Sequence, residues 1–354
     1  MPLVAHNDLP SFAKLRQEGV RVLDPGHADQ QDIRELHIGL LNMMPDAALG
    51  ATEKQFFRLI GESNPIAQFF VHPFTLDALP RDAAAREHVD RYYESFASIK
   101  EQGLDALIIT GANVIGADLS EEIFWDPLIE VADWAQEHVT STLCSCLATH
   151  AVLDFRCGQK RGQLRRKKWG VYRHRVVDAA HPLVTDINTE FDVPHSRWND
   201  VSRAQFEAAG LKVLVTGEGD CVHLATSADG LRSVFFQGHP EYDTISLLKE
   251  YKRDVNLYID GGLQDYSPMP DNYFSQFAAA VMREYRLRVD RCLVAGQPVP
   301  EFPEHLVIET LKNTWQDTAS AVVGKWIGLV YQFTGVDRRT PFMDGVDPEN
   351  PLGL

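Results

Sequence analysis

The stretch from Val139 to Phe155, VTSTLCSCLATHAVLDF, decides the fold. Residues 139–143 are rich in β-branched side chains and have the length of a strand, whereas residues 147–155 place apolar side chains at helical spacing. Cys144 and Cys146 lie at the junction. A strand followed directly by a helix is the repeating unit of parallel sheets. We therefore expect this stretch to lie inside an α/β sheet.

The same alternation continues on both sides of this unit. Strands are predicted over 36–44, 66–74 and 106–109, helices over 51–60, 83–98 and 119–138, a β-rich region over 171–234 with a hairpin turn at 227–230, and helices over 244–259, 272–286 and 314–333. The pattern predicts an α/β, doubly wound, mostly parallel sheet with helices on both faces and with N- and C-terminal helical additions. We divide the chain into an N-terminal extension (1–34), one large domain (35–300), and a C-terminal helix with an irregular tail packed on it (301–354).

The charge of the chain excludes some partners. The 354 residues carry a net charge of −16, which repels nucleic acid and anionic membranes, so an anionic ligand needs a local basic cluster. Lys160 to Lys168 (KRGQLRRKK) is such a cluster, and on composition alone it is read as a solvated loop. The sequence has no apolar run of membrane-spanning length and no signal-peptide pattern at its start. We expect a cytoplasmic enzyme with small-molecule substrates.

The five cysteines are an odd set and a poor disulfide framework, so reduced thiols are expected. Cys144 and Cys146 are separated by one residue, and no second Cys/His pair at zinc spacing follows. No metal site and no cofactor are therefore expected. One of these thiols is a candidate nucleophile.

Cys146 would stand at a helix N-terminus beyond the carboxyl end of a strand, where ligands bind in open α/β sheets. There, free backbone N–H groups stabilise a thiolate and can hold an oxyanion. Most free cysteines, however, are only small buried hydrophobes. The segment Gly238-His-Pro-Glu241 adds a histidine at a strand end with a carboxylate two residues later, which would supply a base and its orienting partner.

Several motifs in order resemble the homoserine O-acyltransferases of methionine biosynthesis, specifically the homoserine O-succinyltransferases, which are related in fold to class I glutamine amidotransferases. The resemblance spans nearly the whole chain. It is carried by Leu9-Pro10, Leu41 to Pro45 (LNMMP), Thr110-Gly-Ala112, residues 139–143 followed by Cys146, Gly170-Val-Tyr172, Pro194-His-Ser-Arg197 and Gly238 to Asp243 (GHPEYD).

This resemblance implies a ping-pong reaction in which a cysteine takes a succinyl group from succinyl-CoA and passes it to the hydroxyl of L-homoserine. It also implies a homodimer. The family's catalytic triad falls on Cys146, His239 and Glu241. Its amino-acid-binding positions fall on Lys167, Ser196 and Arg253, of which Arg253 has the planar fork suited to a carboxylate.

The chain departs from the family pattern at two places that concern the site. Residues 46–51 lack the usual lysine and read as a longer loop before Thr52-Glu53, so the oxyanion is expected to be held by backbone N–H groups near Ala112 and Leu147. The acyl-specificity position holds Ile115, which is neither the glycine that accompanies succinyl transfer nor the glutamate that accompanies acetyl transfer. Succinyl is favoured because a glutamate, which would repel the distal carboxylate, is absent. The C-terminal region from Pro300 matches the family only loosely.

Other readings stay open at this point. The donor is alternatively acetyl-CoA, and the acceptor alternatively serine, because one methylene changes binding by only about 1–3 kcal/mol in a simple pocket. A glutamine amidotransferase would need glycines flanking the nucleophile, where Ser145 and Leu147 stand. A catalytically inactive binding protein of the same fold is a different class. The joint presence of Cys146, His239 and Glu241 argues against it.

Overall fold

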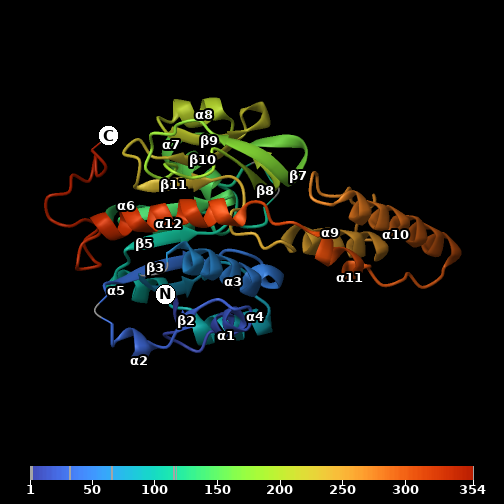
Figure 1. Ribbon diagram of the computed structural model, residues 1–354, viewed down its shortest axis with the longest axis horizontal. Coiled ribbons are helices and arrows are strands. Elements are labelled where there is room, and N and C mark those ends of the chain that lie inside the picture. Colours follow the sequence, from blue (N-terminus) through green and yellow to red (C-terminus); the bar gives the residue numbers. More distant parts are fainter. Residues whose placement is uncertain (1–2, 32, 65–66, 115, 117, 354) are drawn as a thin grey trace.

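The computed structural model describes residues 3–353 except 32, 65–66, 115 and 117. Within these residues one sheet of eleven strands runs through the body, in the order β2-β1-β4-β3-β5-β6-β11-β10-β9-β7-β8 (Figure 1). The strands are β1 (Leu3–Val4), β2 (Val22–Leu23), β3 (Glu35–Leu41), β4 (Gln68–Phe74), β5 (Ala106–Ile109), β6 (Ser141–Ser145), β7 (Gly162–Val176), β8 (Glu190–Asp200), β9 (Lys212–Gly217), β10 (Val222–Thr226) and β11 (Ser233–Phe236).

Helices cover both faces of this sheet, and three more project from it. They are α1 (Pro10–Gln17), α2 (Pro25–Ala28), α3 (Asp46–Ser63), α4 (Ala83–Tyr92), α5 (Phe96–Gln102), α6 (Trp125–His138), α7 (Leu147–Cys157), α8 (Arg203–Ala208), α9 (Ser246–Ile259), α10 (Gln276–Ala295), α11 (Glu304–Val307) and α12 (Gln316–Phe333), with 3-10 turns at Glu218–Asp220 and Ile308–Thr310. Strand β5 shows the two layers. Ala106 and Ile108 belong to the core under α3 and α12, whereas Leu107 and Ile109 belong to the core under α6 and α7.

The sheet changes character at β11. Neighbouring strands from β2 to β11 in the sheet order run parallel, and β11, β10, β9, β7 and β8 then pair in antiparallel fashion. The predicted α/β class, with a mostly parallel sheet between two layers of helices, is confirmed. The predicted hairpin is also confirmed, because β10 and β11 pair antiparallel on either side of residues 227–230.

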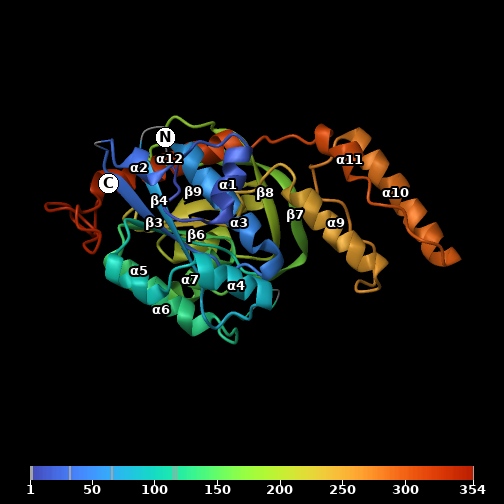
Figure 2. The same cartoon turned by 90° about the horizontal axis from the view of Figure 1, so that it is seen from below.

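Helices α9, α10 and α11 form an arm that projects from the body (Figures 1 and 2). The arm has its own apolar core, to which β7 contributes Trp169 and Val171, α9 contributes Tyr251 and Val255, and α10 contributes Met282 among others. Strand β7 therefore joins the body to the arm. The first turns of α9, the next element after β11 in the chain, lie at this junction.

Three sequence predictions about local structure are wrong. The helix expected over 83–98 is two helices, because the chain breaks at 93–95 and the Ser95 side chain caps α5 by accepting from the backbone N–H of Ser98. The basic run is a strand from Gly162 onward instead of a solvated loop, since β7 pairs with β8 from Gly162↔Asp200.

The third error concerns residues 46–51, which form the first turns of α3 instead of a longer loop. Asp46 lies in the first turn, where a carboxylate is favourable, and it accepts from the guanidinium of Arg81 at 3.0 Å and from the backbone N–H of Asp82 at 2.8 Å. The extra residues therefore lengthen a helix, and they do not add a flexible segment to the site. None of the helices in the described part of the chain is long and apolar enough to cross a membrane.

Candidate active site

Cys146 occupies a sharp turn between β6 and α7. Its backbone has φ 53° and ψ −109°, a left-handed conformation that costs a residue with a side chain about 1–3 kcal/mol. A hydrogen bond to the neighbouring strand stabilises the turn, because the N–H of Cys146 donates to the carbonyl of Phe236 at the end of β11 at 2.7 Å. The hydroxyl of Thr149 lies 2.9 Å from the same carbonyl and 2.9 Å from that of Cys144. The surrounding hydrogen bonds thus fix a strained turn that presents the thiol.

His239 and Glu241 follow directly after β11, the strand next to β6. Nδ1 of His239 lies 2.8 Å from Oε1 of Glu241, and both side chains are buried. The backbone N–H of His239 donates to the carbonyl of Pro194, and the Tyr242 ring stacks on the imidazole with centroids 4.3 Å apart. Nε2 of His239 is buried and makes no hydrogen bond to oxygen or nitrogen among the described residues. The imidazole is therefore fixed by one nitrogen and left available at the other.

The electrostatics couple this nitrogen to the thiol. Burial alone would raise the pKa of Cys146, but the adjacent His239 imidazole, assisted by Arg197, lowers that pKa below its ordinary value. Burial alone would lower the pKa of His239, but the Cys146 thiolate and the Glu241 carboxylate raise it well above its ordinary value. The interaction therefore favours a thiolate and an imidazolium over two neutral groups. Burial raises the pKa of Cys144 to about 12, so that thiol stays protonated.

This coupling predicts the pH dependence of thiol alkylation. Only the thiolate reacts, so the rate of Cys146 alkylation by iodoacetamide should stay high below the ordinary pKa of a thiol and fall as the pH drops through the lowered pKa. In His239→Asn the imidazolium is lost while burial remains, so the pKa of Cys146 should rise. We expect a rate at pH 7 that is at least about tenfold lower, which corresponds to one pKa unit. Superimposable pH profiles for the two proteins would contradict the coupling.

The chain at the predicted oxyanion positions passes close to Cys146. A Cβ atom built on Gly111 would lie 3.4 Å from Cβ of Cys146 and 3.7 Å from the backbone nitrogen of Leu147. The backbone at 111–112 therefore passes against the turn, and Leu147 is the first residue of α7, where backbone N–H groups lack intrahelical partners. Gly111, the neighbour of Ala112, is thus brought against Cys146 and Leu147. Ile115 lies outside the described residues.

The predicted substrate-binding residues meet at a carboxylate that sequence reasoning missed. Glu250 on α9 accepts from the hydroxyl of Ser196 at 2.6 Å and lies 3.4 Å from Nζ of Lys167. The hydroxyl of Tyr242, whose ring stacks on His239, donates to the other oxygen of Glu250 at 2.6 Å. Although burial alone would raise the pKa of Glu250, Lys167 and the two hydroxyl donors lower it, so the carboxylate is ionised. One chain of contacts therefore links Lys167 and Ser196 to His239.

Arg253 lies one helical turn after Glu250 on α9, close enough for the two charges to interact. Its side chain is 57% exposed and donates twice to the carboxylate of the adjacent Asp254. The structure therefore brings Lys167 and Ser196 together directly, and leaves Arg253 at the rim with a guanidinium that solvent reaches. The sequence offered no signal for Glu250, which stands three residues before Arg253 on α9.

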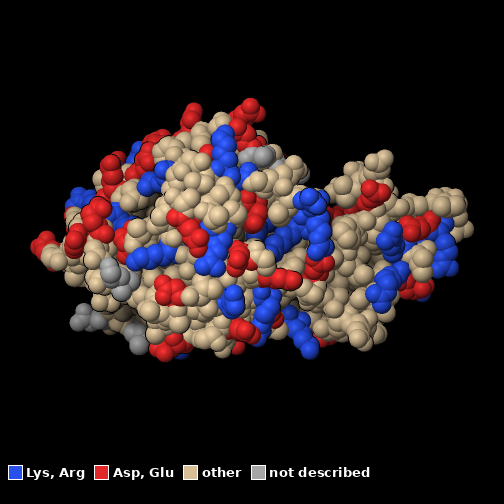
Figure 3. Space-filling model, turned by 90° about the horizontal axis from the view of Figure 1, so that it is seen from above, with Lys and Arg blue, Asp and Glu red and all other residues tan. Residues whose placement is uncertain are grey.

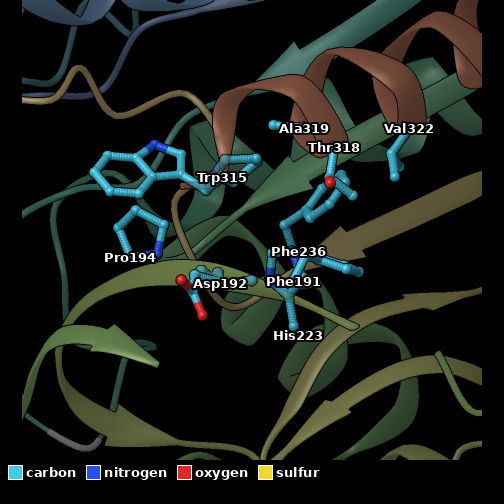
Figure 4. A pocket seen from close by; sticks show the side chains of 11 residues that line it. Phe191, Asp192, Pro194, His223, Phe236, Trp315, Thr318, Ala319 and Val322 are labelled. Carbon is cyan, nitrogen blue, oxygen red and sulfur yellow. The ribbon is translucent and has the colours of Figure 1, made fainter. Parts of the chain in front are cut away.

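A small, mostly apolar cavity beside β8 has too little space for a substrate. It is formed by β8, β10, β11 and the start of α12, and its volume is about 10 Å³, the space of about one water molecule (Figure 4). Its walls include Phe191, Pro194, Phe236, Trp315 and Val322. The cavity lies behind the strand that supports His239, and we assign it to packing.

The homoserine O-succinyltransferase family model matches residues 2–336. The chain belongs to the homoserine O-succinyltransferase family. Relatives of that name come from Allochromatium vinosum, 64% identical over 100% of this chain and 99% of the relative, and from Thiobacillus denitrificans, 64% identical over 100% of both chains. Among solved structures, a glutamine amidotransferase from Thermotoga maritima is 11% identical and matches 84% of this chain and 98% of that chain with a TM-score of 0.44.

Membership of this family confirms the prediction, made from the ordered motifs, that the chain is an acyltransferase of the homoserine O-succinyltransferase type. The assignment of individual roles to Cys146, His239 and Glu241, and to the residues around Glu250, stays a prediction. The geometry above supplies its physical basis.

Proposed function

We propose that the protein transfers a succinyl group from succinyl-CoA to the hydroxyl of L-homoserine, giving O-succinyl-L-homoserine and CoA in methionine biosynthesis. The observation that carries this proposal is the constellation of Cys146, His239 and Glu241 within a chain of this family. A buried thiolate, an imidazolium beside it and a carboxylate on the far nitrogen are the parts that covalent acyl transfer requires.

In the first half of the reaction the Cys146 thiolate attacks the thioester carbonyl. Backbone N–H groups at Leu147 and Ala112 stabilise the developing oxyanion by hydrogen bonds. They need no reorganisation, because the turn is already fixed. Collapse of the tetrahedral intermediate breaks the bond to the CoA sulfur, which takes its proton from Nε2 of His239. The products of this half are free CoA and a succinyl thioester on Cys146.

In the second half the homoserine hydroxyl gives its proton to Nε2 of His239 and attacks the acyl-enzyme carbonyl. Collapse expels the Cys146 thiolate beside the newly formed imidazolium, which restores the starting state. The Nδ1–H of His239 donates to Glu241. This contact holds the imidazole in place and stabilises its positively charged form throughout the reaction. Thiol, imidazole and backbone donors supply this chemistry, and we propose no cofactor for it.

The acceptor is proposed to bind between α9 and strands β7 and β8. Glu250, ionised and linked to His239 through Tyr242, suits the ammonium group, and Arg253 suits the carboxylate. Binding both charged ends orients the hydroxyl toward the histidine. The names of the relatives support homoserine over serine as the acceptor and succinyl over other acyl groups.

CoA is proposed to approach along the exposed basic side chains of β7. Figure 3 shows Lys and Arg side chains gathered over this strand, beside the hollow between the body and the arm. Arg165 and Arg166 are exposed, and Arg166 pairs with Asp271 at 3.2 Å. In a chain with a net charge of −16, this local cluster is suited to attract the phosphates of CoA.

The decisive experiment isolates the first half of the reaction. We expect incubation with succinyl-CoA, without acceptor, to add one succinyl mass to the intact protein, to locate on the peptide of Cys146, and to be discharged by homoserine. Acetyl-CoA serves as the donor control and serine as the acceptor control.

An acetyl adduct in place of the succinyl one would move the donor to acetyl-CoA, and discharge by serine alone would move the acceptor. No adduct from either donor on a folded protein would refute acyl transfer through Cys146. We further propose a homodimer in the cytoplasm that binds no nucleic acid and no membrane; like the division of the chain at residues 34 and 300, these stay predictions.

A further inference from the structure

Gln237 lies between the two segments that carry the proposed nucleophile and the proposed base. It is the first residue after β11 and stands two residues before His239, at a bend where the strand pairing of β11 ends. The residue is fully buried. Burial of an amide is costly unless its polar atoms are hydrogen-bonded. The partners of Gln237 therefore show which parts of the molecule it joins.

The side-chain amide of Gln237 has a partner for each of its hydrogens and lone pairs. Its Oε1 accepts from the backbone N–H of Val201 at 3.0 Å and lies 2.8 Å from Nε2 of His150. Its Nε2 donates to the carbonyls of Val201 at 3.1 Å and of Val222 at 3.0 Å. A backbone N–H can only donate, so the contact with Val201 fixes which end of the amide is the oxygen. Nε2 of His150 therefore donates to Gln237.

The contact with His150 reaches the helix that begins at the proposed nucleophile. His150 lies on α7 one turn after Cys146, and its backbone N–H donates to the carbonyl of Cys146 at 3.4 Å. Nδ1 of His150 is buried and has no hydrogen-bond partner among the described residues, so the imidazole bonds through Nε2. The side chain of His150 therefore joins α7 to the segment 237–239, in addition to the hydrogen bond from Cys146 to Phe236.

The backbone of the same segment is packed closely against β8 and β10. The N–H of Gln237 donates to the carbonyl of His223 on β10 at 2.9 Å. A Cβ atom built on Gly238 would collide with the side chain of Val193 on β8, so the chain already lies as close to that strand as a glycine allows. A displacement of Gln237 would therefore be passed along the chain to His239, because the packing leaves no room to absorb it.

We propose that Gln237 is a positioning residue for acyl transfer, which sets the imidazole of His239 against the thiol of Cys146 by joining α7, β8 and β10 to the segment of the base. This inference rests on the proposed function, because that reaction requires the imidazole beside the thiolate. A misplacement of about 1 Å can lower the rate by about 100-fold. Gln237 is buried with its polar atoms engaged, so it acts through this geometry and not by contact with a substrate.

Another buried glutamine of the sheet provides the matched control. Gln68 on β4 is also buried, and its Nε2 donates to the carbonyl of Ala28 at 3.2 Å and to Oε1 of Gln31 at 2.9 Å. Strands β3 and β5 separate β4 from β6, so Gln68 joins no segment of the candidate site. If buried amides served only the stability of the fold, loss of Gln68 and loss of Gln237 would have the same effect on the rate.

Replacement of His150 by phenylalanine tests the proposal, because it removes the hydrogen bond to α7 and leaves Val201 as the donor to Oε1 of Gln237. We expect kcat to fall by about tenfold with little change in the KM of either substrate. The pH profile of Cys146 alkylation by iodoacetamide should move to higher pH, since the imidazolium would lie farther from the thiolate. Gln237→Met should lower kcat by about 100-fold with a shift in the same direction. Gln68→Met should lower the melting temperature and leave kcat and the alkylation profile unchanged.

An unchanged kcat or an unmoved alkylation profile in His150→Phe, with folding verified by circular dichroism, would overturn the proposal. It would also be overturned if Gln68→Met lost as much kcat as Gln237→Met, because the amide would then act through stability alone. If Gln237→Met does not fold, His150→Phe decides, since it loses a single side-chain hydrogen bond. Alkylation needs no substrate, so the position of the thiol is tested even if the parent protein forms no succinyl adduct, the result that would refute the proposed acyl transfer.

Discussion

Replacement of Cys146 by alanine is expected to lower kcat for O-succinylhomoserine formation by about 10⁴-fold or more, as removal of a nucleophile does in enzymes with a covalent intermediate. The physical reason is that Cys146 alone combines a thiol with a position beside His239 and the start of α7. Backbone donors remain in the variant, but no acyl-enzyme can form.

Cys144→Ala is the matched control. Cys144 is two residues away, fully buried, and holds its proton because burial raises its pKa to about 12, so its loss should leave most of the activity. Both variants are compared by steady-state CoA release and by intact mass after incubation with succinyl-CoA. Equal loss of activity in the two folded variants would reject Cys146 as the nucleophile.

Glu250→Gln is expected to lower kcat/KM for homoserine by about 100-fold, while acylation by succinyl-CoA continues at nearly the same rate. Removal of one member of a buried, hydrogen-bonded charge pair costs about 2–5 kcal/mol, and the amide keeps the shape of the carboxylate without its charge. The variant leaves Lys167 without its counter-charge and removes the proposed partner of the substrate ammonium. Single-turnover measurements of the two half-reactions separate these effects.

Two further variants sharpen this test. Glu304→Gln removes a carboxylate that pairs with Lys252 on the arm at 2.6 Å, and it should leave both half-reactions unchanged. Arg253→Ala should raise the KM for homoserine without slowing acylation, since Arg253 is assigned to the acceptor carboxylate. If homoserine saturates Glu250→Gln and the parent protein equally, the acceptor does not bind at Glu250.

The β6–α7 unit was predictable because its information is local. Strand and helix periods meet at Cys146 within seventeen residues, and β5 was predicted over the same residues that the structure shows. The residues 46–51 were misread because they were compared in length with a family pattern, whereas Ala47, Ala48 and Leu49 are themselves good helix formers. The many charged side chains at the start of β7 likewise led to its prediction as a loop. Its strand character depends on pairing with β8, which the local sequence does not reveal.

The candidate site also contains some residues that the sequence could predict and one that it could not. His239 and Glu241 are two residues apart, so their contact could be inferred from the chain itself. Glu250 is one of fifty acidic residues, and nothing in its local sequence distinguishes it from a solvated helical glutamate. Its importance comes from the packing of α9 against β7 and β8, which brings Lys167 and Ser196 to it. Tertiary contacts of this kind have no periodic signature.

The left-handed backbone of Cys146 places the needs of the fold and those of the proposed catalysis in conflict at one position. A glycine there would adopt the same angles without strain, and the hydrogen bond from position 146 to Phe236 would remain. The fold alone is thus better served by a residue that has no thiol. A cysteine at this turn is therefore what the proposed acyl transfer requires and what the fold alone does not.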